Sequence, residues 1–538
     1  MKKKLVQLII VGMMATLLGC QANAEESGTS SEEETREVIE LEDMEEDASN
    51  EETLGEGDSE AEQENAGDPE LSRESDYLDV TFAYEGDSYY TDTLLTMYHF
   101  NTIVLENSDY PELSQAVEQW NEAYRSETMA YLEEMQTMAE EEYEAYGPDS
   151  FIGPYTLEAD MFLRRADSTA LSVVLSVYSY AGGAHGMTAF DCVNLDSLTG
   201  EEITLDAVVT DVSRLPEFIA DEMMAAYPHI TYLTETLEDT IQEYVTPTDP
   251  AYAPEFVWTL GYDGITFYFG SYAIGSYADG VQQVTLTYSE YPELFQPEYF
   301  ETAAENYAVD VVGYYSDTDL NRDRVADYIQ VVSRYDAEYG LGESYEVRVN
   351  DAVFSQYSYY YELDVHLAEH AGKNYLLVER TMENAYQVVD IYEITPDAVT
   401  FVADAEGGLE CFTNTDEFTM LRRADLLSTY QVLADCQMQE DGTVSTLNPR
   451  HEITWDITLV TICDLPAELI DEEGNLLGES VVFPAGTEFT LEVTDGSTFV
   501  EAVTSDGSRC ILYTEFGEVQ TVNGYPVEEV FEMMFFAG

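Results

Sequence analysis

The clearest metal-binding pattern in this 538-residue chain is a run of oxygen-bearing side chains at alternate positions. Asp317, Asp319, Asn321 and Asp323 are spaced two residues apart, and Asp327 adds a carboxylate four residues further on. A turn that presents acceptors at alternate positions can surround one hard cation, and Ca²⁺ takes about six to eight oxygen ligands. The pattern indicates either a calcium loop or a solvated turn rich in Asp and Asn.

A second pattern, His366-x-x-Glu369-His370, matches the inverted zinc-hydrolase signature H-x-x-E-H. That signature works on a helix, where histidines four residues apart share one face. Here the apolar residues between positions 361 and 367 alternate with polar ones, which indicates a strand, and Gly372 leaves no room for a long helix. We interpret the match as chance and keep a metal-dependent cell-wall hydrolase as the enzyme alternative.

A third pattern is a glycine-rich turn that follows a β-branched run ending at Tyr180. Glycines let a loop adopt a positive φ or approach a ligand closely, and a histidine among them can donate or accept a hydrogen bond. The alternative is a structural turn whose histidine is satisfied within the fold. The candidate ligand-binding residues are Tyr180, Gly182, Gly183, His185 and Gly186. We predict no catalytic residue.

The elements that must position these residues alternate between helices and strands up to about residue 300. A long amphipathic helix is expected over 111–146, and the alternating runs predict an α+β domain with an antiparallel sheet over residues 78–302. Shorter helices are expected at 216–227 and 234–245, and strands at 155–180, 256–260, 265–269 and 283–288.

The remainder of the chain has the signals of β-structure. Residues 303–463 predict a mostly-β domain that carries the candidate calcium loop, with strands near 345–349, 375–378, 386–392 and 399–402. In residues 464–538, Asp-Gly pairs separate short strands, which favours a small SH3-like barrel. Five cysteines, Cys192, Cys411, Cys436, Cys463 and Cys510, show no C-x-x-C spacing, so neither a structural zinc site nor a redox motif is indicated. One or two disulfides among the last four are permitted in an extracellular protein, and their pairing cannot be read from the sequence.

The N-terminus indicates export. Three lysines precede a short apolar stretch that ends in Leu17-Leu18-Gly19-Cys20, so residues 1–19 are expected to be a signal peptide cleaved before Cys20. Residues 20–77 are acidic and poor in aromatic side chains, so we expect a disordered tether, with an acidic binding tail as the alternative.

The charge balance excludes nucleic acid as a partner. The chain has 19 Lys and Arg against 110 Asp and Glu, a net charge of −91, whereas binding to a phosphate backbone needs clustered cations. Residues 78–538 alone have 14 Lys and Arg against 87 Asp and Glu. An acidic surface suits a basic extracellular partner, although acidity also serves solubility.

Several of these motifs occur in an order that resembles a known extracellular module. They are the Tyr178–Gly186 segment, Asn194-Leu-Asp196 through Thr199-Gly200, Asp263-Gly264-Ile265-Thr-Phe267, and the Tyr272–Gly280 segment. Together they resemble the extracellular domain of RsiV-type anti-sigma factors, which also precedes the catalytic domain of PdaC-type peptidoglycan deacetylases.

The resemblance implies recognition of lysozyme, of another basic extracellular protein or of a peptidoglycan-related ligand. The start of the chain resembles bacterial lipoproteins, which implies diacylation of Cys20 and attachment to the membrane only through that lipid. The calcium pattern resembles the loops of FG-GAP and VCBS repeats, except that Arg324 replaces the expected glycine. We therefore expect a non-enzymatic cell-surface binding protein, with a hydrolase and a structural adhesin or spacer as alternatives.

Overall fold

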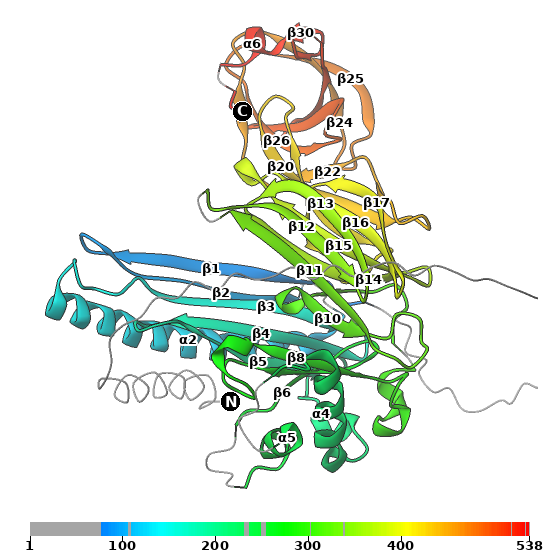
Figure 1. Cartoon of the computed structure of the whole chain (residues 1–538). Helices are drawn as coiled ribbons and strands as arrows, with labels where there is room; N and C mark the ends of the chain where they lie inside the picture. Colours follow the sequence, from blue (N-terminus) through cyan, green and yellow to red (C-terminus); the bar gives the residue numbers. More distant parts are fainter. Residues whose placement is uncertain are drawn as a thin grey trace, which may run out of the picture.

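The computed structural model in Figure 1 describes residues 77–105, 109–230, 236–248, 254–301, 303–336, 339–517, 519–532 and 534–536. The predicted signal peptide, Cys20 and the tether up to residue 76 lie outside the described residues, so cleavage, lipidation and disorder there stay predictions. Within the described residues no helix is both long enough and apolar enough to cross a bilayer.

The N-terminal part is built on a five-stranded sheet with the strand order β1-β2-β3-β4-β5. A long helix, α2 (Pro111–Tyr146), has the bounds expected from its sequence periodicity. The strands are β1 (Val80–Tyr90), β2 (Leu94–Leu105), β3 (Tyr155–Ala166), β4 (Ala170–Tyr180) and β5 (Met187–Asp196).

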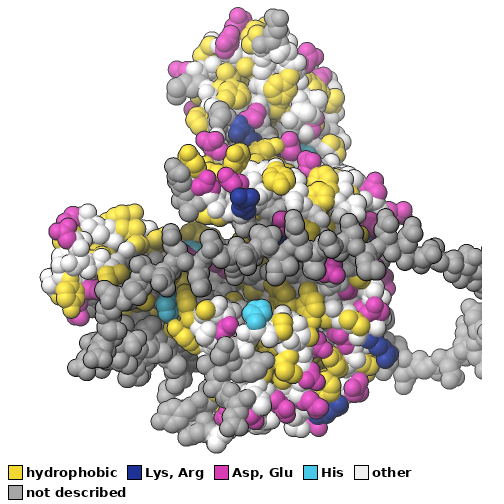
Figure 2. All heavy atoms as spheres, viewed as in Figure 1, with side chains coloured by type: hydrophobic (Ala, Val, Ile, Leu, Met, Phe, Trp, Pro, Cys, Tyr) yellow, Lys and Arg dark blue, Asp and Glu magenta, His cyan; other side chains and the backbone are white. Residues whose placement is uncertain are grey.

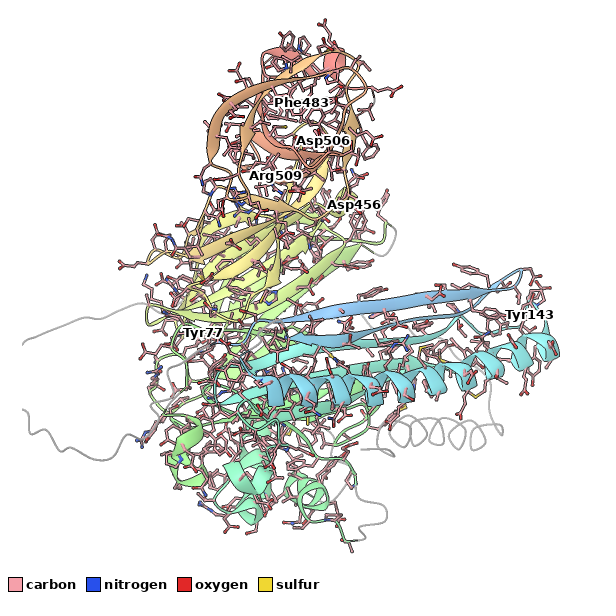
Figure 3. All side chains as sticks on the ribbon, turned by 180° about the vertical axis from the view of Figure 1, so that it is seen from behind. Tyr77, Tyr143, Asp456, Phe483, Asp506 and Arg509 are labelled. Atoms are coloured by element: carbon pink, nitrogen blue, oxygen red, sulfur yellow. The ribbon has the colours of Figure 1, made fainter. Side chains whose placement is uncertain are left out.

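The expectation of a purely antiparallel sheet is wrong for one strand pair. β2 and β3 run parallel, with Thr96 opposite Tyr155, whereas the other pairs of this sheet are antiparallel. Parallel neighbours need a crossover connection, and α2 supplies it between these two strands. The helix then packs along one face of the sheet (Figure 3), where Leu113, Val117 and Met135 are buried against it.

The two faces of this sheet have different environments because side chains alternate along each strand. On β3, Leu157, Met161 and Leu163 belong to the core under α2, while Asp160 and Phe162 point to the opposite face. Part of that opposite face packs against the three-stranded sheet of β6 (Val257–Leu260), β7 (Gly264–Phe269) and β8 (Gln282–Thr287). The β-rich part of the chain packs against another part of it.

The rest of the N-terminal part combines short helices with the small antiparallel sheet. The helices α4 and α5 pack against each other and, with the β6–β8 sheet, enclose a second apolar core. The bounds are α3 (Leu205–Val208), α4 (Leu215–Ala226), α5 (Leu237–Val245), β6 (Val257–Leu260), β7 (Gly264–Phe269) and β8 (Gln282–Thr287).

From residue 308 to about residue 526 the described structure is built of strands. One sheet has the order β10-β11-β12-β13 and another the order β17-β16-β15-β14-β9, and Tyr345 and Tyr392 meet in the core between them. The bounds are β9 (Ala308–Asp310), β10 (Tyr315–Thr318), β11 (Asp327–Asp336), β12 (Leu341–Val349), β13 (Ala352–Tyr360), β14 (Glu362–His370), β15 (Lys373–Thr381), β16 (Gln387–Thr395) and β17 (Ala398–Glu406).

The remaining strands form one connected sheet rather than a separate small unit, so the SH3-like barrel is not confirmed. β20 pairs with β22, and β22 pairs with β26, which joins strands on both sides of the expected boundary at residue 464. The bounds are β18 (Gly408–Cys411), β19 (Phe418–Ala424), β20 (Tyr430–Met438), β21 (Val444–Thr446), β22 (His451–Ile453), β23 (Thr458–Val460), β24 (Leu465–Ile470), β25 (Leu476–Phe483), β26 (Glu488–Thr494), β27 (Phe499–Thr504), β28 (Arg509–Glu515), β29 (Thr521–Val522), β30 (Tyr525–Pro526) and the short helix α6 (Val527–Val530).

Buried polar contacts join the segments that pack around β3. Arg165 is fully buried, lies 2.8 Å from a carboxylate oxygen of Asp167, and donates to the backbone carbonyls of Gly261 and Tyr299. Further along the chain, Asp310 of β9 accepts a hydrogen bond from the backbone N–H of Leu163 at 2.6 Å. The N-terminal part and the β-rich part are therefore in direct contact.

Candidate functional site

The glycine-rich turn predicted to bind a ligand forms the loop between β4 and β5. Gly182 and Gly183 adopt φ values of 81° and 93°, which only glycine enters without cost. A Cβ atom on Gly186 would lie 2.4 Å from the ring of Tyr178, and Tyr180 donates from its hydroxyl to the carbonyl of Gly183 at 3.2 Å. The loop is therefore held in one compact conformation that presents His185.

His185 is enclosed by two tyrosines from a distant segment. Its ring stacks on Tyr277 with centroids 3.7 Å apart and planes 20° from parallel, and Tyr272 lies 6.1 Å away. The Nδ1 atom lies 3.0 Å from the carbonyl of Gly186, which only accepts, so Nδ1 carries the hydrogen and Nε2 accepts from the Tyr272 hydroxyl at 3.4 Å. The three rings form a surface that we call the His185 cluster.

The second segment of the His185 cluster is also rigidly built. Tyr272 has a φ of 64°, an uncommon conformation for a residue with a bulky side chain. Ser276 and Asp279 form a reciprocal capping box around the turn that starts at Tyr277. Tyr272 and Tyr277 are 42% and 39% exposed, so their rings are available to a partner.

The sequence predicted one half of this cluster. Tyr180, Gly182, Gly183, His185 and Gly186 belong to one loop, as expected, but Tyr272 and Tyr277 were not predicted as site residues. The sequence pointed to them only as members of the Tyr272–Gly280 segment, one of the motifs that carry the family resemblance. Only the fold places that segment beside His185. Whether this loop binds a ligand stays a prediction.

The candidate calcium residues do not form one set of free ligands. Asp317 faces β8, where it accepts hydrogen bonds from the backbone N–H and the hydroxyl of Thr285. Asp319 accepts from the backbone N–H groups of Asp323 and Arg324. Within the described ranges no group of three or more His, Cys, Asp or Glu is arranged to hold a metal ion.

The other three members of that pattern also accept hydrogen bonds. Asn321 accepts from the N–H of Asp323, and Asp323 accepts from the N–H of Val325. Asp327 accepts from the N–H of Leu320 and from the side-chain amide of Asn350. Arg324, which replaces the expected glycine, has a φ of 73°, so the backbone takes the glycine-like conformation that the pattern requires. Calcium binding stays a prediction.

The H-x-x-E-H residues lie on strand β14 rather than on a helix, as the alternation predicted. His366 and His370 share one face of the strand, but four residues of strand separate them by about 13 Å. His366 contacts Asp310 at 2.8 Å and His370 contacts the hydroxyl of Thr415 at 2.8 Å, while Glu369 lies near Arg322. The arrangement therefore lacks the shared helix face that the zinc signature needs.

Two family models match the N-terminal part of the chain. The model described as Deacetylase PdaC matches residues 91–188, and the model described as Protein of unknown function (DUF3298) matches residues 210–289. The matches cover both segments of the His185 cluster. They agree with the expected RsiV- and PdaC-type extracellular domain, whereas the lipoprotein and VCBS resemblances stay predictions.

Solved structures provide further similar proteins. A DUF3298 family member from Bacteroides fragilis NCTC 9343 is 20% identical and has a TM-score of 0.33, over 43% of this chain and 99% of that chain. A DUF3298 family protein from Pseudomonas aeruginosa PAO1 is 18% identical and has a TM-score of 0.28, over 42% of this chain and 97% of that chain. No curated protein matches this chain.

The surface around these elements is strongly acidic. Eleven of the 14 Lys and Arg residues beyond residue 77 lie within 4.0 Å of a carboxylate oxygen, so they are already partnered within the fold. Figure 2 shows acidic side chains scattered over the visible face and few basic ones. Most carboxylates beyond residue 77 therefore have no Lys or Arg partner, because 14 basic residues stand against 87 acidic ones.

Proposed function

We propose that this protein is a non-enzymatic cell-surface protein that binds a basic extracellular protein of the lysozyme type through the His185 cluster. The observation that carries the proposal is the cluster itself. Two family-matched segments, residues 91–188 and 210–289, meet where His185 stacks on Tyr277 beside Tyr272, and both tyrosines are exposed. Exposed aromatic rings held in fixed conformations are favourable contact residues because little side-chain entropy is lost on binding.

The acidic surface supports a basic partner. Complementary charge raises the rate of association and adds favourable interactions at the rim of an interface. Aromatic rings can also accept the cationic side chains of such a partner, and each contact contributes about 0.5–1 kcal/mol at an exposed site. A peptidoglycan-related ligand is the second candidate, because the family matches support a cell-wall-related extracellular domain.

The proposal is tested by calorimetric titration of hen egg-white lysozyme into the mature chain, residues 20–538, at low salt and at 0.15 M salt. We expect saturable binding that weakens with salt, because exposed charges are screened over about 8 Å at 0.15 M. Replacing Tyr277 with Ala is expected to weaken binding by at least about tenfold, as for an aromatic contact at the centre of an interface.

A matched control is available on the β-rich part. Tyr357 of β13 is 82% exposed and lies outside both family matches, so Tyr357→Ala is expected to leave lysozyme affinity unchanged. Absence of lysozyme binding, or equal effects of Tyr277→Ala and Tyr357→Ala, contradicts the proposal. Retention of the mature chain on peptidoglycan, lost in Tyr277→Ala, supports the second candidate instead.

A further inference from the structure

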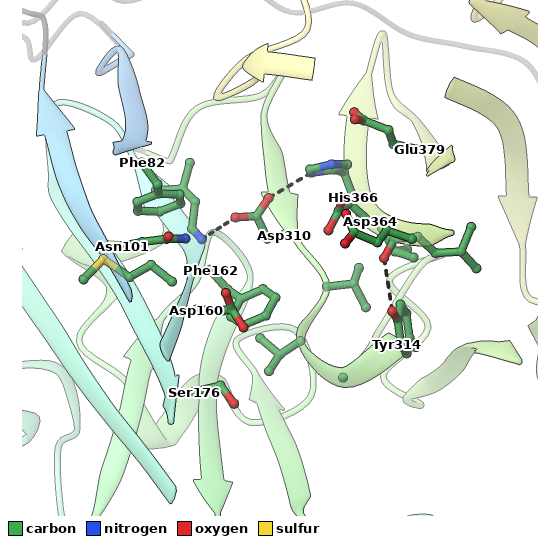
Figure 4. Close-up of a pocket in the computed structure, with 18 of the residues that line it drawn as sticks. Phe82, Asn101, Asp160, Phe162, Ser176, Asp310, Tyr314, Asp364, His366 and Glu379 are labelled. Carbon is green, nitrogen blue, oxygen red and sulfur yellow. Dashed lines mark hydrogen bonds and ion pairs between the residues drawn. The ribbon is translucent and has the colours of Figure 1, made fainter. Parts of the chain in front are cut away.

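A cavity of about 870 Å³ lies between the N-terminal sheet and the β-rich part. One wall is the face of β1–β4 that does not pack on α2, including Phe82, His99 and Asp160. The opposite wall comes from β9, β14 and β15, including Asp310, His366 and Glu379. Figure 4 shows Phe82 and Asp160 of the first wall together with Asp310 and His366 of the second. The volume is in the range of small-molecule sites in proteins.

The charged groups that line the cavity have one predominant sign. Six carboxyl groups line it, and no Lys or Arg is among the lining residues; the carboxyl groups belong to Asp160, Asp310, Glu362, Asp364, Glu379 and Glu410. Two of them are partnered by histidines, Asp160 by His99 at 3.0 Å and Asp310 by His366 at 2.8 Å. His366 also faces Asp364 and Glu379, so two histidines stand against six carboxyl groups at the cavity wall.

In two of these carboxyl groups the surrounding protein disfavours the charged form. Asp364 is accessible from the cavity, yet the protein around it desolvates the carboxylate and raises its pKa. Burial raises the pKa of Glu379 to about 7, against the hydrogen bonds that it accepts from the N–H of Leu409 and the amide of Gln387. A bound cation would stabilise the charged form of both groups.

Two residues of the cavity wall carry a buried acceptor atom without a donor in the described part of the chain. Gln282 is only 2% exposed and its Nε2 donates to two backbone carbonyls, which leaves its buried Oε1 without a donor among the described residues. The buried Oδ1 of Asn101 also has no donor there. Both residues line the cavity. Buried acceptors are normally satisfied, but these two oxygen atoms have almost no accessible surface, so a ligand reaches them only if their side chains shift.

Aromatic rings complete the lining. Tyr314, Tyr335 and Tyr361 line the cavity and are 41%, 57% and 49% exposed, so they stand where it meets solvent. Tyrosine faces attract organic cations, and carboxylates beside them hold the charged head group. We propose that this cavity binds a small organic cation that carries amine or guanidinium groups, at a site separate from the His185 cluster.

The test uses the mature chain and the diamine 1,4-diaminobutane, with the neutral 1,4-butanediol as the matched probe. At pH 8 and 0.15 M salt, calorimetry is expected to show saturable one-to-one binding of the diamine and none of the diol. Replacing Asp364 with Asn is expected to weaken binding by about tenfold or more, because a carboxylate that lines the cavity is lost. Glu440→Gln, an exposed carboxylate outside the cavity, controls for the general acidity of the chain.

The pH dependence gives a second readout that does not rely on a variant. Glu379 faces Asp364 and His366 of β14, Gln387 of β16 and the N–H of Leu409. Because its carboxyl group ionises as the pH rises through about 7, diamine affinity is expected to increase between pH 6 and pH 8, and less so in Glu379→Gln.

Two results overturn the proposal: no saturable binding at pH 8, or equal weakening by Asp364→Asn and Glu440→Gln. Competition between lysozyme and the diamine would contradict the separation of this site from the His185 cluster, and simultaneous binding of both would support it. Loss of lysozyme binding in Tyr277→Ala with diamine binding retained separates this site from the His185 cluster.

Discussion

The carboxylate of Asp317 accepts two hydrogen bonds from Thr285, one from the backbone N–H at 2.9 Å and one from the hydroxyl at 2.8 Å. This contact joins the first strand of the four-stranded β10–β13 sheet to β8 of the N-terminal part. The side chain of Asp317 is 4% exposed. A carboxylate at this position is costly, because it must lose its hydration when the chain folds.

We predict that Asp317 makes the folded chain less stable as the pH rises. Burial raises the pKa of Asp317 to about 7, above the ordinary value of 3.8. Its contribution to stability is therefore fully present below pH 3.8 and is lost as the pH rises through about 7. We expect urea denaturation to show that, between pH 5 and pH 8, Asp317→Asn loses less unfolding free energy than the unchanged chain. The difference is expected to be roughly 2–4 kcal/mol. Asp456→Asn, at an exposed position (Figure 3), is the control; an unchanged pH slope in Asp317→Asn contradicts the prediction.

The Arg165–Asp167 ion pair is predicted to be among the most sensitive positions to single substitution. Both side chains are essentially inaccessible, at 0% and 1% exposure. Asp167→Asn leaves the guanidinium of Arg165 buried without its charged partner, which is expected to cost about 3–5 kcal/mol of unfolding free energy. Chemical denaturation measures the loss.

The matched control for that substitution is an ion pair at the surface. Arg348 contacts Glu346 at 2.6 Å, with side chains 42% and 38% exposed. Arg348→Met is expected to cost less than about 1 kcal/mol, because water and salt screen an exposed pair. Similar losses for Asp167→Asn and Arg348→Met would show that burial is not what makes the first pair important.

Calcium binding at the Asp319 loop is predicted to be weak and to depend on Arg324. The loop carboxylates already accept backbone hydrogen bonds, and a cation must compete with the charge of Arg324. We expect a dissociation constant on the order of 10⁻³ M, as for weak extracellular calcium modules. Arg324→Gly removes a positive charge and a side chain at a φ of 73°, so it is expected to raise the melting temperature and to tighten calcium binding. Magnesium is the control ion. If calcium shifts the melting temperature of neither the unchanged chain nor Arg324→Gly, the prediction is contradicted.

The pair between His366 and Asp310 is predicted to stabilise the fold more at low pH than at high pH. Burial lowers the pKa of His366, but the hydrogen bond to Asp310 and the nearby carboxylates outweigh it and raise the pKa above 6.5. The contribution is therefore present below pH 6.5 and is lost as the pH rises through the raised value. His366→Gln should cost more unfolding free energy at pH 5.5 than at pH 8.5. His229→Gln, at an exposed position, should show no such difference.

Local sequence patterns predicted many of the elements. The helix from Pro111 to about residue 146 was predicted because its apolar positions recur near helical spacing and Pro111 marks its start. The hairpins around Asp495-Gly496 and Asp506-Gly507 followed from their turn residues. The alternation around His366 was enough to place the H-x-x-E-H pattern on a strand. These properties depend on neighbours within a few residues.

Tertiary structure decided which distant segments meet. Periodicity cannot show that β2 pairs with β3 in parallel, that β22 joins strands on both sides of residue 464, or that Asp317 faces Thr285 rather than the calcium loop. The same holds for the packing of Tyr277 on His185 and for the acidic cavity. The sequence by itself determined the acidic charge and the local elements, because these depend on residue type and spacing. The sites depend on contacts between residues that are far apart in the chain, and only the packed fold sets those contacts.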